Sequence, residues 1–356
     1  MSTPTTPAPA PAVPAGPKVN RLGLPVAEYQ GARSTLCPGC GHDVVTNTLI
    51  SALWEMGVEP HLVAKMSGIG CSSKTPNYFL NRSWGFNSVH GRMPTVATGA
   101  LLANRTLRGI GVSGDGDTAA IGMGHFVHLL RRNVPMVYVC ENNGVYGLTK
   151  GQFSPTADVG SKLKSGVAND LPPVDLCSLA IELGCGFVAR SFSADRKQLL
   201  QILKAAVAHR GLAFLDVISP CVTFNDHPGS TKSYDYGREH QEAVNEIGFV
   251  PSWEHAEREV DVPPGEAIDV EMPNGGTIKV RKVREDFDPR DRAAALDLLR
   301  EANVKKEFIT GLFYVAPQDQ NFLDHLNLVD EPLATLPESR VRPSKAALEQ
   351  IMAELR

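Results

Sequence analysis

Short apolar segments alternate with segments of helical periodicity between residues 42 and 219. Strands that are apolar along their whole length are buried on both faces, and helices between such strands are typical of a parallel sheet. The sequence therefore predicts an α/β fold with a mostly parallel sheet flanked by helices. The expected strands are residues 61–68, 108–114, 134–143, 186–190 and 212–219. The expected helices are residues 42–57, 93–107, 118–132, 175–184 and 195–209.

Changes in composition divide the chain into three regions. We expect a disordered Pro/Ala-rich tail at 1–20, an α/β domain at 21–249 and a C-terminal extension at 250–356. In the extension, alternating residues flank an Asn-Gly-Gly sequence within 265–283, which indicates a β-hairpin, and a final helix is expected at about 343–355. Residues 150–174 have no clear period, and long segments of this kind are often lids or binding loops.

Composition excludes several classes of protein. The net charge of −4 argues against a nucleic-acid surface, which usually contains a basic patch. Because no apolar run approaches the roughly 20 residues that cross a bilayer, no membrane partner is expected. The N-terminus has no signal-peptide pattern, so we expect a cytoplasmic protein. Its seven cysteines are then more consistent with buried thiols and metal ligands than with a disulfide framework.

One motif combines acidic and glycine residues at the end of an expected strand. The sequence SGDGDTAA, residues 113–120, follows one strand and opens a helix, and CENNGVYG, residues 140–147, ends the next strand. In a right-handed β-α-β unit, Asp115 and Asn143 would both emerge at the C-terminal edge of neighbouring parallel strands. Ligands of open α/β sheets bind at that edge.

The residue types in these two segments fit a diphosphate held through a cation. Gly114 and Gly116 let the backbone approach a phosphate, and the helix that follows directs its free N–H groups and positive dipole end toward it. Asp115, the side-chain oxygen of Asn143 and the main-chain oxygen of Val145 are hard ligands suited to Mg²⁺. A GDG followed by a second strand and NN resembles the signature of thiamine diphosphate (TPP) sites.

A pair of cysteines precedes the first expected helix in the sequence TLCPGCGHD. Cys37 and Cys40 could hold one edge of a metal site or form a redox disulfide, since a thiol before a helix has a lowered pKa. A zinc ribbon usually supplies a second C-x-x-C pair, which this chain lacks. The sequence of the pair alone leaves these alternatives open.

Two further cysteines lie at the ends of expected strands. Cys71 is in SGIGCSS and Cys221 is in ISPCVTF, and parallel strands would bring both to the edge that carries Asp115. Four thiolates suit a 4Fe–4S cluster, and zinc accepts the same ligands. A redox centre beside TPP favours iron, because it can accept electrons from the cofactor. The remaining cysteines, expected to pack in the core, are Cys140, Cys177 and Cys185.

Taken together, these motifs resemble the TPP-binding β subunit of 2-oxoacid:ferredoxin oxidoreductases, with the subgroup acting on 2-oxoglutarate most similar. The motifs that carry the resemblance, spread over about residues 20–240, are CPGCGHD, SGIGCSS, HGR, SGDGD, ENNGVYGLTKGQ and SPCVTFND. The resemblance implies that one 4Fe–4S cluster is bound by Cys37, Cys40, Cys71 and Cys221. It implies that Mg²⁺ is bound by Asp115, Asn143 and Val145. It implies a TPP site lined by Ile69, Gly70, Ser72, His90, Gly116, Asp117, Gly147 and Leu148.

The resemblance also implies an activity. Its expected form is TPP-dependent oxidative decarboxylation of 2-oxoglutarate to succinyl-CoA and CO₂, possible in reverse, with electrons passed through the cluster to ferredoxin. Lys150, just after the Asn-Asn turn, would bind the substrate carboxylate, with a solvated loop lysine as the alternative. For His90, a role at the phosphate and a role as a capping histidine are both open.

The same resemblance implies a partner. TPP chemistry usually needs a glutamate at N1′ of the aminopyrimidine, and no residue of these motifs is expected to fill that role. In this family it comes from an α subunit, so we expect an α₂β₂ assembly that also meets coenzyme A, a 2-oxoacid and ferredoxin. The alternatives are the same chemistry on pyruvate or another 2-oxoacid, a TPP-dependent decarboxylase or synthase without a redox centre, and a zinc-stabilised non-catalytic subunit.

Overall fold

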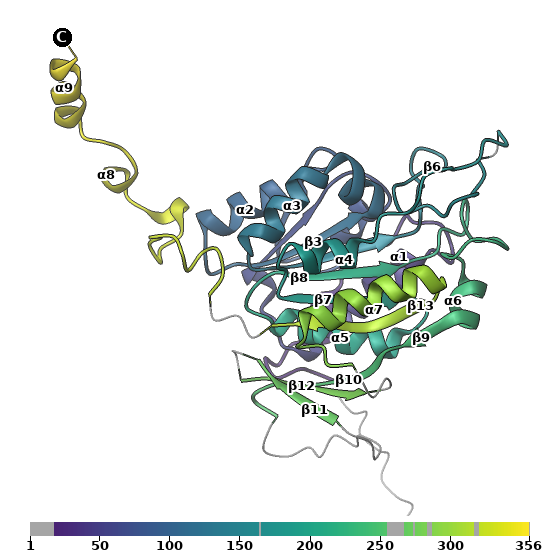
Figure 1. Ribbon diagram of the computed structural model, residues 1–356. Helices are drawn as coiled ribbons and strands as arrows, with labels where there is room; N and C mark the ends of the chain where they lie inside the picture. Colours follow the sequence, from purple (N-terminus) through teal and green to yellow (C-terminus); the bar gives the residue numbers. More distant parts are fainter. Residues whose placement is uncertain are drawn as a thin grey trace, which may run out of the picture.

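The computed structural model describes residues 18–163, 165–254, 267–272, 275–282, 287–316 and 320–355. Within these residues, the largest unit is an eight-stranded sheet with the order β2-β1-β3-β4-β8-β7-β13-β9 (Figure 1). Most of the expected N-terminal tail, residues 1–17, lies outside the described residues. The strands of the main sheet are β1 (Val63–Ser67), β2 (Trp84–Asn87), β3 (Arg108–Gly114), β4 (Met136–Asn142), β7 (Phe187–Phe192), β8 (Ala213–Ile218), β9 (Gln241–Ala243) and β13 (Phe308–Val315).

The main sheet is mostly parallel, as predicted. From β2 to β7 every neighbouring pair of strands is parallel, and β13 then runs antiparallel to β7. The expected strand at 108–114 coincides with β3, and the other four expected strands overlap β1, β4, β7 and β8. The C-terminal ends of β1, β3, β4 and β8 therefore lie at one edge of the sheet.

Helices cover both faces of the main sheet (Figure 1). Successive residues of β4 point to opposite faces, so that Val137 and Val139 pack with α1 and α5, whereas Met136 and Tyr138 pack with the helices of the other face. The helices of the first face are α1 (Gly41–Glu55) and α5 (Arg196–Ala208). The helices of the second face are α2 (Met93–Ala103), α3 (Met123–Arg132), α4 (Leu176–Glu182) and α7 (Arg292–Lys305).

The expected helix at 118–132 is interrupted. It starts as a short π-helix, η4 (Asp117–Ile121), and continues as α3 only after Gly122. Wider helical turns of this kind occur often at functional sites. The π-helix begins at Asp117, the last residue of the GDGD motif, so it belongs to the predicted site.

The region after residue 240 adds strands to the main sheet, a helix to one of its faces and a second, smaller sheet. The expected hairpin is present as β11 (Ala267–Glu271) and β12 (Thr277–Lys282), although residues 273 and 274 of its turn lie outside the described residues. β10 (Asn245–Val250) adds a third strand, and this small sheet packs on α5. The sequence analysis did not predict α7 or β13, which cover and extend the main sheet.

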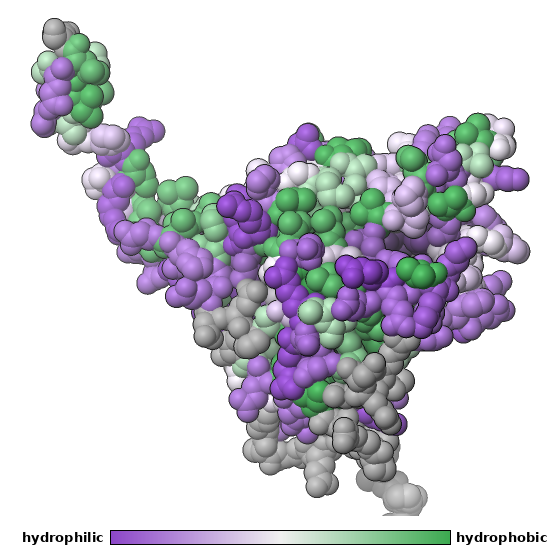
Figure 2. Space-filling view, in the orientation of Figure 1, coloured by the Kyte–Doolittle hydropathy of each residue, from purple (hydrophilic) through white to green (hydrophobic). Residues whose placement is uncertain are grey.

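A C-terminal arm extends away from the body of the molecule (Figure 1). Its last helix, α9 (Lys345–Glu354), matches the expected terminal helix, and its exposed apolar side chains are visible in Figure 2. None of the described helices is both long and apolar enough to cross a membrane. The remaining short elements are η1 (Val26–Tyr29), η2 (Pro60–Leu62), η3 (Ser72–Asn77), β5 (Val145–Tyr146), β6 (Gln152–Phe153), α6 (Tyr234–His240), η5 (Leu333–Thr335) and α8 (Glu338–Val341).

Three aromatic rings fill the core behind η4. Phe214 is fully buried, with its ring centroid 5.0 Å from that of Phe126 and 5.7 Å from that of Tyr138. We predict that Phe214→Ala lowers the free energy of unfolding by about 3–5 kcal/mol, because it removes this packing and leaves a cavity. Urea denaturation measures the change. Val304→Ala, at a side chain that is 79% exposed on α7, is the control and should change it by less than about 0.5 kcal/mol. Equal effects of the two substitutions would contradict the assigned core.

Candidate functional site

A cavity lies at the C-terminal edge of the main sheet, where β1, β3 and β4 end. Its walls come from the loop after β1, the segment before α2, the GDGD motif and the Asn-Asn turn. The structure thus brings together every residue that the sequence analysis assigned to TPP and Mg²⁺. The lining residues are His42, Ile69, Gly70, Cys71, Ser72, His90, Gly114, Asp115, Gly116, Asp117, Glu141, Asn143, Val145, Tyr146, Gly147, Leu148 and Thr149.

Asp115 and Asn143 face each other across this cavity edge. Asp115 is buried, and its carboxylate accepts hydrogen bonds from the backbone N–H groups of Asn143 (3.5 Å) and Gly144 (3.1 Å). Burial raises the pKa of Asp115, while hydrogen bonds from neighbouring hydroxyl groups oppose that shift. The oxygen atoms of Asp115 and Asn143, with the carbonyl of Val145, are a donor set that suits Mg²⁺.

His90 and Asp117 form a second polar pair in the cavity wall. The Asp117 carboxylate accepts hydrogen bonds from the Gly91 N–H (2.6 Å) and the Ser113 hydroxyl (2.8 Å), and it contacts Nδ1 of His90. The imidazole of His90 therefore has a fixed orientation at the cavity, and its edge faces the ring of Tyr146 at a centroid distance of 6.2 Å. Tyr146 was not among the residues predicted from the sequence.

The Cys37–Cys40 turn packs against the loop that carries Cys221. The Gly41 N–H donates to Pro220 O (3.2 Å), and the Thr223 hydroxyl lies 3.5 Å from Sγ of Cys37. Cys40 is the N-cap of α1, so the positive end of this helix faces the thiols. This arrangement places the C-x-x-C pair beside the end of β8, as the motif analysis predicted.

Cys71 lies between these thiols and the cavity. A Cβ atom on Gly147 would be 3.6 Å from Sγ of Cys71 and 3.6 Å from Sγ of Cys221, so the two sulfur atoms are at most twice that distance apart. Glycine at this position leaves the space between them open. Because Cys71 and Gly147 also line the cavity, the thiol cluster and the candidate cofactor site share a wall.

Burial affects the protonation of the thiols near the cavity. Burial raises the pKa of the Cys40 thiol to about 12, and burial together with neighbouring thiols raises the pKa of Cys71 and Cys221. Metal binding would have to displace these protons. Four thiolates suit either a zinc ion or a 4Fe–4S cluster.

A buried acid and a buried imidazole also line the cavity. The Glu141 carboxylate accepts a hydrogen bond from the Thr75 hydroxyl at 3.0 Å and lies 3.6 Å from Nδ1 of His42. Burial raises the pKa of Glu141 and lowers the pKa of His42 to about 4. Neither residue was among the predicted site residues, although His42 belongs to the CPGCGHD motif and Glu141 opens the ENNGVYGLTKGQ motif.

Lys150 lies outside the cavity wall. Its side chain is exposed, and its backbone has a φ of 80°, which is uncommon for a residue other than glycine. Backbone conformations of this kind cluster at functional sites. The structure places Lys150 two residues beyond Leu148, at the start of the segment 150–174.

The cavity is open and small on this chain alone. Its volume of about 80 Å³ is well below the roughly 300–1,000 Å³ of typical small-molecule pockets. Exposed aliphatic side chains occur at and near its lining: Leu148 (49% exposed) lines the cavity, and Val89 (70%) directly precedes His90 of its wall.

Comparisons with known proteins agree with this geometry. A family model described as the thiamine pyrophosphate enzyme C-terminal TPP-binding domain matches residues 68–217. The chain is 43% identical to a 2-oxoacid:ferredoxin oxidoreductase subunit beta of Saccharolobus solfataricus over 61% of this chain and 70% of the relative. It is 36% identical to the 2-oxoglutarate synthase subunit KorB of Methanocaldococcus jannaschii over 67% of this chain and 88% of the relative.

A solved structure covers nearly the whole chain. It is a 2-oxoglutarate:ferredoxin oxidoreductase from Magnetococcus marinus, described with 2-oxoglutarate, coenzyme A and succinyl-CoA bound. The TM-score is 0.69 at 28% sequence identity, and the match covers 93% of this chain and 96% of that chain. The similarity therefore includes the region after residue 250 as well as the motifs.

Proposed function

The chain belongs to the β subunits of the 2-oxoacid:ferredoxin oxidoreductases, and we propose that it acts in the oxidative decarboxylation of 2-oxoglutarate to succinyl-CoA and CO₂. The observation that carries the proposal is the shared wall between two sites. Cys71 and Gly147 line the candidate TPP cavity and also lie against Cys221. A decarboxylation site placed directly beside a thiol cluster suits a reaction whose electrons must leave in single steps.

The residues in and beside the cavity have separate proposed roles. Asp115, Asn143 and the Val145 carbonyl would hold Mg²⁺, and the start of η4 would face the diphosphate with its free N–H groups. Bound TPP would supply an electron sink for decarboxylation of a 2-oxoacid. His90, held by Asp117, would keep a ring N–H or lone pair at a fixed place in the wall. The cluster ligands would be Cys37, Cys40, Cys71 and Cys221.

The proposal includes an α subunit that completes the site. The small volume of the cavity and its apolar rim support a second protein surface at its mouth. We propose an α₂β₂ assembly that passes electrons to ferredoxin and the acyl group to coenzyme A. The described cysteines form no disulfide with one another, and we place the enzyme in the reducing cytoplasm.

The choice of 2-oxoglutarate rests on two of the similar proteins. The relative from M. jannaschii is named for 2-oxoglutarate, and the structure from M. marinus is described with 2-oxoglutarate bound. Lys150, close to the mouth of the cavity, is the proposed partner of a substrate carboxylate. The alternative substrates are pyruvate and other 2-oxoacids.

The cofactor site is tested at Asp115. We predict that Asp115→Asn weakens Mg²⁺-dependent TPP binding by at least about tenfold, because the neutral amide keeps the shape of the side chain and loses the charge that holds the cation. Calorimetric titration of the cofactor-stripped complex with TPP and Mg²⁺ measures the effect. Asp170→Asn, on the exposed part of segment 150–174, is the control. Wild-type affinity in the Asp115 variant would contradict the assignment of this cation ligand.

The cluster is tested at Cys221. Anaerobically isolated protein should contain about four irons per chain, and Cys221→Ser should lower that content because it removes a ligand. Cys177→Ser is the matched control, since Cys177 lies on α4, is fully buried in the core and is not a proposed ligand. Metal and sulfide analysis gives the answer. Stoichiometric zinc without iron would overturn the redox assignment in favour of a zinc-bound subunit, and absence of both would favour a non-redox TPP enzyme.

The substrate anchor is tested at Lys150. A charge-assisted hydrogen bond in a partly desolvated site contributes roughly 1.5–3 kcal/mol, so Lys150→Ala should raise the KM for 2-oxoglutarate at least about tenfold while iron and TPP contents stay constant. Lys162→Ala removes another exposed lysine of the same segment and should leave the KM unchanged. A normal KM in Lys150→Ala would show that Lys150 is a solvated loop residue. The same assay with pyruvate tests the substrate preference.

A further inference from the structure

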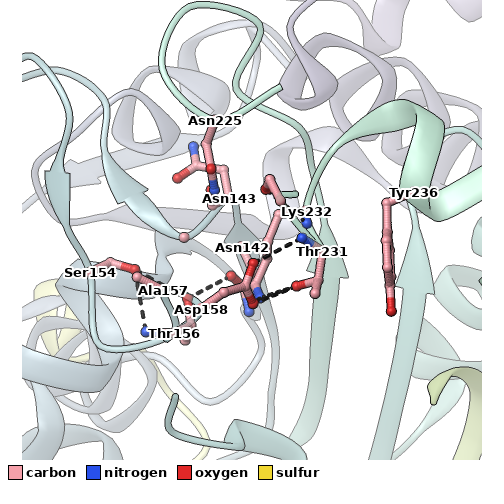
Figure 3. Close-up of polar contacts among 12 residues, drawn as sticks. Asn142, Asn143, Ser154, Thr156, Ala157, Asp158, Asn225, Thr231, Lys232 and Tyr236 are labelled. Carbon is pink, nitrogen blue, oxygen red and sulfur yellow. Dashed lines mark hydrogen bonds and ion pairs between the residues drawn. The ribbon is translucent and has the colours of Figure 1, made fainter. Parts of the chain in front are cut away.

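Two hydroxyl groups from segment 150–174 reach the buried carboxylate of Asp115. Ser154 and Thr156 follow β6, and both side chains are buried, at 5% and 2% exposure. The Thr156 hydroxyl lies within hydrogen-bond distance of Oδ2 of Asp115, at 2.5 Å, and the Ser154 hydroxyl donates to the same oxygen. Figure 3 shows Ser154 and Thr156 together beside Asn142 and Asn143.

The two oxygens of this carboxylate have unequal surroundings. Oδ2 also accepts the N–H of Gly144 at 3.1 Å, from a residue whose left-handed φ of 74° suits glycine. Oδ1 is less well satisfied. Apart from Asp115 itself, the described residues give Oδ1 one contact, and it is long: 3.5 Å from the N–H of Asn143. Three donor groups therefore lie within hydrogen-bond distance of Oδ2, while Oδ1 keeps lone pairs to offer.

We propose that Ser154 and Thr156 are positioning residues that turn Asp115 so that Oδ2 faces the protein and Oδ1 faces the cation. The inference rests on the proposed function, because it assumes that Asp115 binds Mg²⁺. Neither hydroxyl lines the cavity, so their effect on the cofactor passes through Asp115. A carboxylate fixed in this way pays no rotamer entropy when the cation binds.

A network of buried polar side chains in turn fixes the position of Thr156. The Asn142 Oδ1 lies 2.8 Å from the Thr156 hydroxyl, and the Asn142 Nδ2 donates to Asp216 at 2.9 Å. Because a carboxylate is an acceptor, the amide of Asn142 must point its NH₂ toward Asp216 and its oxygen toward Thr156. Asp216 is in turn held by Arg190 at 2.9 Å, from the neighbouring strand β7.

Two hydroxyl groups are needed at this site because two buried oxygen atoms each require a hydroxyl proton. The Thr156 hydroxyl has one proton and two acceptors within reach, Oδ2 of Asp115 and Oδ1 of Asn142. Ser154, whose Oγ lies 3.1 Å from that of Thr156, supplies the second proton. Two hydroxyl protons then serve two acceptors, and both the cation ligand and the amide are satisfied.

The network also ties the site to the C-terminal part of the chain. Arg190 donates to Asp175 at 3.1 Å, and Asp175 caps the N-terminus of α4. Asp175 also accepts a hydrogen bond from Asn303 of α7 at 3.1 Å. A continuous series of hydrogen bonds thus connects Asp115, the proposed cation ligand, to α7, a helix that lies outside the motifs.

The test is the apparent affinity for Mg²⁺ at a fixed TPP concentration, measured calorimetrically on the cofactor-stripped complex with its α subunit. Thr156→Val keeps the shape and removes the hydroxyl, and we expect Mg²⁺ affinity to fall about tenfold or more. Thr156→Ser retains the hydroxyl and should restore affinity to within about threefold of wild type. Thr98→Val is the matched control, because Thr98 is buried and its hydroxyl bonds to Pro94 O at 2.8 Å, on α2.

The outcomes separate a positioning role from a structural one. Wild-type Mg²⁺ affinity in a folded Thr156→Val protein would overturn the proposal, even if its unfolding midpoint in urea were lowered. Should Thr156→Val fail to fold, Ser154→Ala decides, with weaker Mg²⁺ binding supporting the proposal and unchanged binding overturning it. Failure of the proposed function has a different signature: Asp115→Asn would then bind Mg²⁺ and TPP like the wild type.

Discussion

The parallel register of β1, β3, β4 and β8 brings the chemistry-bearing residues of this chain together. Because these strands run in one direction, their C-terminal ends meet at one edge of the sheet. Cys71 follows β1, Asp115 follows β3, Asn143 follows β4 and Cys221 follows β8. An antiparallel arrangement would send half of these residues to the opposite edge. The cofactor cavity and the thiol cluster are thus consequences of strand direction.

Burying polar groups at this edge of the sheet is unfavourable because they lose contact with water, and hydrogen bonds within the site compensate for that loss. A buried carboxylate is expensive unless its lone pairs are satisfied, and Asp115 and Asp117 each accept several hydrogen bonds. Glu141, in the cavity wall, has fewer donors, and burial raises its pKa. The rigid environment of Asp115 and the sparser one of Glu141 indicate different tasks for the two acids.

Much of the site could be predicted because its residues occur in short motifs at strand ends. A strand, a Gly-Asp-Gly turn and a helix leave few alternatives for where Asp115 lies, and β3 has the predicted limits. Ser154 and Thr156 could not be found in this way, since segment 150–174 has no period and its contacts depend on how the loop folds back. β13 was missed for a similar reason: it joins the sheet antiparallel to β7 after a long excursion, so no local alternation connects it to its neighbours.

The central claim is that this chain holds one half of an active site that a second subunit completes. The most direct measurement is CoA-dependent oxidation of 2-oxoglutarate, with a ferredoxin or viologen acceptor, by the isolated chain loaded with its cluster and TPP. The account predicts almost no turnover by the chain alone, recovery when the α subunit is added, and renewed loss when one α-subunit glutamate is changed. Full turnover by the isolated chain, abolished by Glu141→Gln, would contradict it and would place the activating acid in this chain.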